Sequence, residues 1–298
     1  MKSLPALPLD EWQETKNTLH LFLQIVGKIR LALFPRMNHL WHAPLYLSAR
    51  GLSTRPIPSG DKTFEIELDL LAHRLRASCS DGSERNFSLI GLSVADFYRQ
   101  LMQSLQELDI QVSIKAQPYD VPFSHIPFAE DTTHATYQAE WVEKYWQILV
   151  FVNTAFEMFR GRFIGKSTPV HLFWHHADLA LTRFSGNPAP ELKGGTKVDK
   201  EAYSHEVISF GFWVGDDVMR EPAFYAYSYP EPENIAQTDL QPAAANWADK
   251  YGYTMALLKF EDIRNADNPQ QQLLTFLQSA YDNFSQQAGW KVSELVCN

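Results

Sequence analysis

The chain has 298 residues, of which 45% are hydrophobic and 20% are charged, and its formal net charge is −9. This composition is typical of a globular protein and excludes a disordered chain. The acidic balance argues against nucleic acid and anionic membrane surfaces as partners, because both require clustered lysine and arginine. No uncharged apolar run of about 18 residues is present, so we expect no transmembrane helix.

The chain contains two cysteines, Cys79 and Cys297. So few thiols indicate a reducing compartment and no disulfide framework. The first eight residues lack the apolar core and the cleavage site of a secretory signal. We therefore predict a cytoplasmic protein.

Hydrophobic periodicity predicts the order of helices and strands. In the first part of the chain we expect a helix at 11–34, strands at 45–49, 63–70, 71–78 and 85–89, a helix at 94–108 and a strand at 110–115. Three prolines with aromatic residues between them predict an extended linker at 117–135. In the second part we expect a helix at 137–162, strands at 174–183, 205–214, 222–229 and 251–258, an exposed loop at 184–203 and a helix at 269–288.

Two segments, 41–50 and 174–183, carry Trp, His and Arg at identical offsets, and a Pro-x-Pro sequence follows each. We interpret this likeness as an internal duplication. The predicted fold class is α+β, with two helix–antiparallel strands–helix repeats, 1–116 and 136–298, in one pseudo-two-fold domain.

The second copy differs from the first by His176 and Asp178, which replace Ala43 and Leu45. If 174–183 is a regular strand, the side chains of His176 and Asp178 share one face. They could then form half of a metal site, with His171, His205 or Glu206 as the third ligand, or an acid–base pair. The alternative is a buried His176 that is hydrogen-bonded to Asp178 and binds nothing. We predict no metal and leave the cofactor open.

The duplicated residues are candidates for ligand binding. Arg50 and Arg183 would bind an anionic group through bidentate contacts. The histidine of one repeat, His42 or His175, could approach the arginine of the other repeat across the pseudo-two-fold axis. The alternative is that both Trp–His pairs are packing features inherited from a duplicated ancestor.

Two further patterns place polar side chains on predicted strands. His205 and Glu206 could act as acid or base at the start of a strand, or they mark its exposed end. Tyr225, Tyr227 and Tyr229 lie on one strand face, where they would line a ligand cleft or form an aromatic layer under a helix. Phosphate-loop, dinucleotide, zinc-protease and serine-hydrolase motifs are missing.

Several segments together resemble the bacterial DUF5996 family of uncharacterised proteins: Gln24–Arg30, Trp41–Tyr46, Ser48–Leu52, Phe173–His176, Asp178–Ala180, Arg183–Gly186 and Ser204–Ser209. The likeness spans most of the chain. It implies no reaction, cofactor or catalytic residue, and it supports one structural unit in place of two independent domains.

The sequence thus predicts a protein that binds a small, anionic molecule in a cleft between the two halves. The catalytic candidates are His176, Asp178, His205 and Glu206, acting as acids or bases or in hydrolysis. The ligand-binding candidates are His42, Arg50, His175, Arg183, Tyr225 and Tyr227. The alternative is a non-catalytic structural or protein-interaction protein, in which the His, Arg and Asp groups are buried and satisfy one another. No oligomeric state is predicted.

Overall fold

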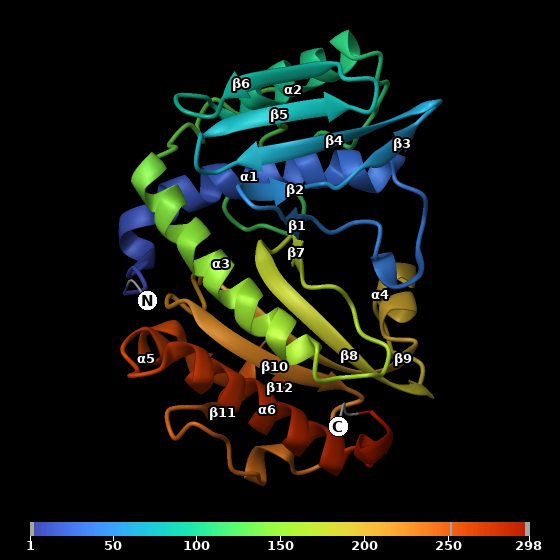
Figure 1. The fold of residues 1–298 in the computed structure, drawn as a ribbon, viewed down its shortest axis with the longest axis vertical. Helices are drawn as coiled ribbons and strands as arrows, with labels where there is room; N and C mark the ends of the chain where they lie inside the picture. Colours follow the sequence, from blue (N-terminus) through green and yellow to red (C-terminus); the bar gives the residue numbers. More distant parts are fainter. Residues whose placement is uncertain (1–2, 251, 296–298) are drawn as a thin grey trace. The chain divides into compact units, whose positions relative to one another are not determined.

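The computed structural model describes residues 3–250 and 252–295, so Cys297 lies outside the described residues. The described chain forms two compact units (Figure 1). Unit 1 contains residues 3–9, 148–170, 178–250 and 252–295, and unit 2 contains residues 10–147 and 171–177.

Unit 2 is built on an antiparallel sheet with the order β1-β2-β4-β5-β6. Its strands are β1 (Tyr46–Leu47), β2 (Gly51–Ser53), β4 (Lys62–Asp69), β5 (Arg74–Cys79) and β6 (Glu84–Ser88), and β3 (Ile57–Ser59) pairs with β4. Phe64, Ile66 and Leu68 of β4 are all buried. Apolar and polar residues alternate in this strand because one of its faces packs against the core, as the sequence predicts.

Helices α1 (Leu9–Leu33) and α2 (Val94–Glu107) supply the core of unit 2, and α1 runs along the sheet (Figure 1). The rings of Phe22 and Phe97 stack with their centroids 4.1 Å apart, which joins the two helices. Ser93 caps α2 by accepting a hydrogen bond from the backbone N–H of Asp96. Residues 17–30 of α1 are buried on all sides of the helix.

The segment after α2 has no regular secondary structure, so the predicted strand at 110–115 is wrong. The N–H of Ile110 bonds to the carbonyl of Leu105 and thereby closes the end of the helix. We call residues 115–134 the strap. The strap belongs to unit 2 and carries the fully buried side chains of Phe128 and Asp131.

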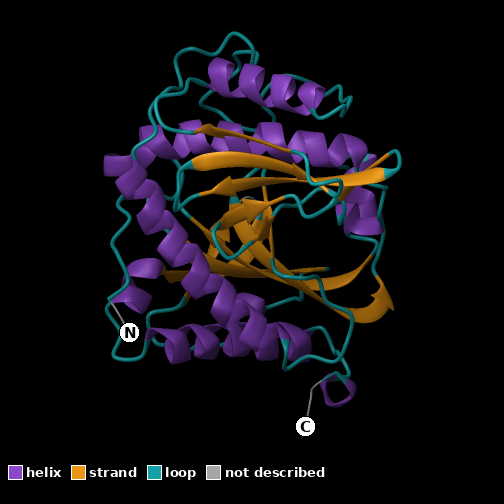
Figure 2. Cartoon of the chain, turned by 45° about the horizontal axis from the view of Figure 1, so that its top comes forward, coloured by secondary structure: helices purple, strands orange, loops and turns teal. Residues whose placement is uncertain are grey.

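Unit 1 contains a second antiparallel sheet, in which five strands follow the order β11-β12-β10-β9-β8. They are β8 (Asp178–Pro188), β9 (His205–Trp213), β10 (Ala223–Tyr229), β11 (Asn246–Lys250) and β12 (Tyr253–Lys259). Figure 2 shows these strands in orange and the helices in purple. The coarse prediction of an α+β fold with antiparallel sheets is thus confirmed.

Helices cover one face of the unit 1 sheet. They are α5 (Phe260–Arg264), α6 (Pro269–Gln287) and the end of α3 (Ala139–Arg160), which begins in unit 2. Phe159 of α3 meets Phe210 of β9 edge to face at 5.0 Å. Within the predicted loop 184–203 the chain instead extends β8 to Pro188 and forms α4 (Lys197–Ala202).

The predicted strand at 174–183 is wrong at its first four residues. Strand β7 (His171–Phe173) ends before a turn at 174–177, and β8 begins at Asp178. The N–H of Ala177 bonds to the carbonyl of Phe173 at 2.7 Å, and Ala177 has a left-handed φ of 56°. Strand alternation therefore does not place His176 and Asp178 on one face.

Among the residues that the structure describes, no helix combines the length and the hydrophobicity needed to cross a membrane.

Gly211 of β9 leaves room for the ring of Tyr225, its partner on β10. A Cβ atom at Gly211 would lie 2.1 Å from Cζ of Tyr225. We expect Gly211→Ala to lower the free energy of unfolding by about 1–3 kcal/mol. In the double variant with Tyr225→Ala most of this loss should disappear, as measured by urea unfolding. Strictly additive losses would contradict the proposed contact.

Candidate functional site

Three polar side chains of α1, His20, Gln24 and Lys28, are spaced four residues apart and therefore share one face of the helix. We call them the polar ridge. All three are buried, although α1 is otherwise a core helix. Each contacts the strap or the segment 171–177, so the ridge organises the polar part of unit 2.

Gln24 fixes the strap through two backbone hydrogen bonds. Its Nε2 donates to the carbonyl of Tyr119, and its Oε1 accepts from the Tyr119 N–H, both at 2.8 Å. These two bonds use both the donor and the acceptor of the buried amide, and they also pair the N–H and the carbonyl of the Tyr119 backbone. Tyr119 is consequently held in place through its main chain, while its side chain is 54% exposed.

His20 fixes the turn at 174–177. Its Nε2 lies 3.0 Å from the carbonyl oxygens of both Trp174 and His175. Carbonyl oxygens only accept hydrogen bonds, so Nε2 carries the proton of the neutral ring. Burial lowers the pKa of His20 to about 4, and the charge of Lys16 adds to this effect.

Trp174 lies directly against α1. A Cβ atom at Gly27 would lie 2.2 Å from the indole ring, so only glycine permits this approach. On its other side the indole Nε1–H donates to the carbonyl of Ala43 at 3.0 Å. The indole therefore forms a fixed wall next to Lys28.

The ammonium group of Lys28 lies 5.7 Å from the ring centroids of both Tyr119 and Trp174. Within the described chain it has no hydrogen-bond acceptor and no carboxylate partner. Burial, with a contribution from the charge of Lys115, lowers the pKa of Lys28.

Two predicted histidines complete this group. The ring of His175 lies 6.5 Å from Tyr119 and 4.4 Å from His176. Burial lowers the pKa of His175 to about 3, with smaller contributions from neighbouring histidines. His176 is exposed, and its Nε2 lies 3.0 Å from Oδ2 of Asp120 in the strap.

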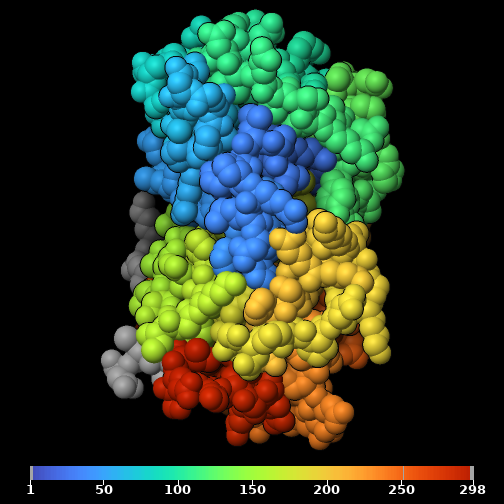
Figure 3. Space-filling view, turned by 90° about the vertical axis from the view of Figure 1, so that its right-hand side faces the viewer, coloured from blue at the N-terminus to red at the C-terminus, as the bar shows by residue number. Residues whose placement is uncertain are grey.

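We call Lys28, Tyr119, Trp174, His175 and His176 the Lys28 site. It is formed by α1, the strap and the turn at 174–177, all within unit 2. Part of the strap, green in Figure 3, lies at the surface. An ammonium group that faces two aromatic rings can bind an anion and also contact a flat apolar group.

The predicted residues of unit 1 form a different network. The hydroxyl of Tyr225 donates to Oδ2 of Asp178, so Asp178 bonds to Tyr225 and His176 bonds to Asp120. The hydroxyl groups of Tyr227 and Tyr203 lie 3.0 Å apart. Burial, and then the charge of Asp178, raises the pKa of Tyr225, which therefore stays protonated and acts as a donor.

His205, Glu206 and Arg183 also have local partners in unit 1. Nδ1 of His205 lies 3.1 Å from Oγ of Ser204, and Glu206 accepts a 2.6 Å bond from Ser185. Arg183 is buried, with its guanidinium 3.6 Å from the centroid of the Phe159 ring, and Nη2 donates to the Phe159 carbonyl at 2.5 Å. Burial lowers the pKa of Arg183 to about 9.

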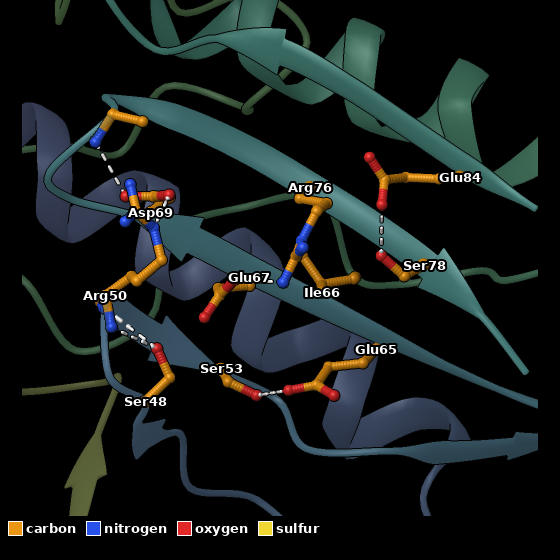
Figure 4. A network of polar contacts seen from close by, with 12 residues as sticks. Ser48, Arg50, Ser53, Glu65, Ile66, Glu67, Asp69, Arg76, Ser78 and Glu84 are labelled. Carbon is orange, nitrogen blue, oxygen red and sulfur yellow. Dashed lines mark hydrogen bonds and ion pairs between the residues drawn. The ribbon is translucent and has the colours of Figure 1, made fainter. Parts of the chain in front are cut away.

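His42 and Arg50 lie elsewhere in unit 2 and have partners of their own. Nδ1 of His42 accepts from the N–H of Met37 at 3.2 Å. Nε of Arg50 donates to Oδ2 of Asp69 at 2.5 Å (Figure 4). Arg50 therefore already has a carboxylate partner, unlike Lys28.

Among residues 3–250 and 252–295, no group of three or more His, Cys, Asp or Glu side chains is arranged to hold a metal ion.

The sequence interpretation missed His20, Lys28, Tyr119 and Asp120. A signal for two of them was present, because polar residues at 20, 24 and 28 recur every four residues inside an apolar helix. A polar stripe on a helix that is otherwise core indicates buried partners. Tyr119 and Asp120 had no such signal, because they lie in an irregular segment.

One family model matches residues 4–297, that of DUF5996, a family of unknown function. No curated protein and no solved structure matches the chain.

The buried His20 makes stability depend on pH. Its pKa is about 4 in the folded protein and about 6.5 in the unfolded chain, so between these values the unfolded state binds more protons. The free energy of unfolding should therefore fall as pH falls through this range, by up to about 1.4 kcal/mol per pH unit from His20. In His20→Gln, which keeps an N–H donor, urea unfolding should show a shallower pH slope. An unchanged slope would contradict a neutral buried His20.

At Gly27 we expect alanine to change stability in the direction opposite to its usual effect in a helix. Alanine normally stabilises a helix interior by about 1 kcal/mol relative to glycine. Because the Cβ atom would collide with Trp174, we expect Gly27→Ala to destabilise the protein in thermal unfolding. The control is Gly161→Ala, where the Cβ atom would meet its nearest neighbour at 3.5 Å. Stabilisation by Gly27→Ala would show that Trp174 does not lie against the helix.

Proposed function

This chain belongs to the DUF5996 family of unknown function, and from the geometry of unit 2 we propose that it binds a small anionic molecule at the Lys28 site. The observation that carries the proposal is Lys28, whose side chain is largely buried while its ammonium group faces two aromatic rings and has no carboxylate partner in the described chain. A largely buried cation is stabilised by pairing with an anion. An anionic ligand would supply the missing partner.

The two rings beside Lys28 suggest the shape of the ligand. Tyr119 and Trp174 lie 6.5 Å apart between centroids and are inclined by 60°. Aromatic walls of this kind favour a flat apolar group next to the charged one. We therefore propose a carboxylate attached to a planar ring or chain as the ligand class.

His176 is the proposed acid–base group of this site. Its partner is Asp120 of the strap, which replaces the Asp178 expected from the sequence. The Asp120 carboxylate orients the imidazole ring for proton transfer. His176 is exposed and its ring lies beside His175, so it is accessible from solvent at the edge of the Lys28 site.

The internal duplication is retained as a proposal. Both Trp–His pairs lie in turns that precede a strand, β1 in the first copy and β8 in the second. The two arginines differ, however, since Arg50 is exposed and Arg183 is buried. Within this proposal, Trp174 and His175 have taken on a ligand-binding role in addition to packing.

The second candidate function is a non-catalytic structural or interaction protein. It is supported by unit 1, where Asp178, Glu206 and Tyr227 each bond to a neighbouring side chain. Under this alternative the predicted catalytic groups hold strands together and have no substrate.

Benzoate, acetate and the neutral analogue benzamide test the ligand class. We expect wild-type protein to bind benzoate more tightly than acetate, and benzamide hardly at all, as measured by isothermal titration calorimetry. Lys28→Met removes the charge and keeps the length of the side chain, so benzoate affinity should fall at least about tenfold.

Lys144→Met is the matched control, because Lys144 also lies over an aromatic ring but is paired with Glu140. Its benzoate affinity should equal that of the wild type. Equal affinities for benzoate and benzamide, or an unchanged affinity in Lys28→Met, would overturn the proposal and favour the structural alternative.

A further inference from the structure

A second cluster of cations in unit 2 surrounds the ring of Tyr46 in β1. The guanidinium carbon of Arg55 lies 3.6 Å from the ring centroid, and that of Arg30 lies 5.4 Å from it. Arg30 comes from α1 and Arg55 from the connection between β2 and β3. Three segments of unit 2 thus bring two positive charges to one tyrosine.

Neither guanidinium has a carboxylate partner within the described chain. Arg30 is 2% exposed, and it bonds to the carbonyl of Thr54 and to the hydroxyl of Tyr46, both uncharged groups. Its Nε atom is buried without a hydrogen-bond partner in the described structure. The nearby carboxylate of Glu65 accepts a bond from Ser53 (Figure 4) and makes no ion pair with Arg55.

Other arginines of the same unit show the usual arrangement. Arg76 pairs with Glu67 at 2.7 Å, and Arg85 pairs with Glu107 at 2.7 Å. Two like charges against one ring repel each other and one of them is buried, so the arrangement is unfavourable unless an anion compensates it. The charge of Arg55 indeed contributes, after burial, to lowering the pKa of Arg30.

The backbone at Arg55 is strained, and this conformation fixes the direction of the Arg55 side chain. Its φ is +57°, in the left-handed region that a residue with a Cβ rarely adopts. Two bonds hold this conformation: the Arg55 N–H donates to Oγ of Ser53 at 2.6 Å, and the Thr54 hydroxyl donates to the Arg55 carbonyl at 2.9 Å. Strain that the surrounding structure maintains is typical of ligand clamps.

We propose that Arg30 and Arg55 form a site for a phosphate group, with Tyr46 as the support between them. Two guanidinium groups match a dianion in charge, and the exposed Arg55 can donate two parallel hydrogen bonds to phosphate oxygens. The exposed Arg55 is the group that a ligand meets first, and the buried Arg30 supplies the second positive charge.

This site is separate from the Lys28 site. Lys28 and Arg30 are two residues apart on α1, so their side chains point about 200° apart around the helix. The proposal therefore does not depend on the proposed function, and the two can be tested on the same preparations of protein.

Inorganic phosphate and phenyl phosphate at about pH 7.5 are the probes, because both are mostly dianionic there. Wild-type protein should bind them with an affinity that falls as salt is added, as followed by phosphorus NMR and calorimetry. Arg55→Met should weaken binding at least about tenfold, and Arg55→Lys, which keeps the charge but loses the planar fork, should weaken it less. Arg55 is exposed, so these variants should fold.

Arg85→Met is the control, since it removes an exposed arginine that is already paired. It should bind phosphate like the wild type. In Lys28→Met, which lacks the Lys28 site, tighter binding of phenyl phosphate than of inorganic phosphate would identify a phosphomonoester as the ligand, and equal binding would identify free phosphate. The proposal is overturned if the wild type does not bind either probe, if Arg55→Met binds as the wild type does, or if binding is lost in Lys28→Met.

Discussion

The contact on which the arrangement of unit 2 depends is that between Trp174 and Gly27. Because Gly27 has no side chain, the indole lies directly on α1, and its N–H bonds to the carbonyl of Ala43. His20 then binds the carbonyls of Trp174 and His175 from the same helix. A turn that is distant in sequence is thereby fixed to α1, and the two histidines that follow Trp174 are placed beside Tyr119 and Asp120 of the strap.

This arrangement leaves the polar ridge only partly satisfied. His20 and Gln24 use their hydrogen-bonding groups on backbone partners, whereas Lys28 faces two aromatic rings without an acceptor in the described chain. A stable fold normally pairs or exposes a charge, and exceptions are expected at functional sites. Elsewhere in unit 2, Arg30 and Arg55 are likewise positive charges that lie beside an aromatic ring and lack a carboxylate partner in the described chain. Both proposals therefore rest on positive charges that the described chain does not neutralise.

Much of the fold could be predicted because periodicity reports burial directly. The long helices, the alternating strand β4 and the capped helices α2 and α6 follow from local pattern. The turn at 174–177 could not be predicted from local pattern. The residue types of Trp174 and His175 are common in strands, and contacts with α1 hold them in a turn instead. For the same reason the strap could not be predicted, since its conformation depends on hydrogen bonds to distant groups such as Gln24. The sequence named His175 and His176 as candidates, and it did not indicate their contacts with Tyr119 and Asp120.

The most direct test is the titration of Lys28 itself. Reductive methylation with isotope-labelled methyl groups gives each lysine an NMR resonance, and the signal that is lost in Lys28→Met identifies Lys28. We predict that this signal titrates below the usual pKa of 10.5 and that benzoate moves its pKa upward, since a bound anion favours the charged amine. A Lys28 signal that titrates with the exposed lysines and does not respond to benzoate would contradict the account.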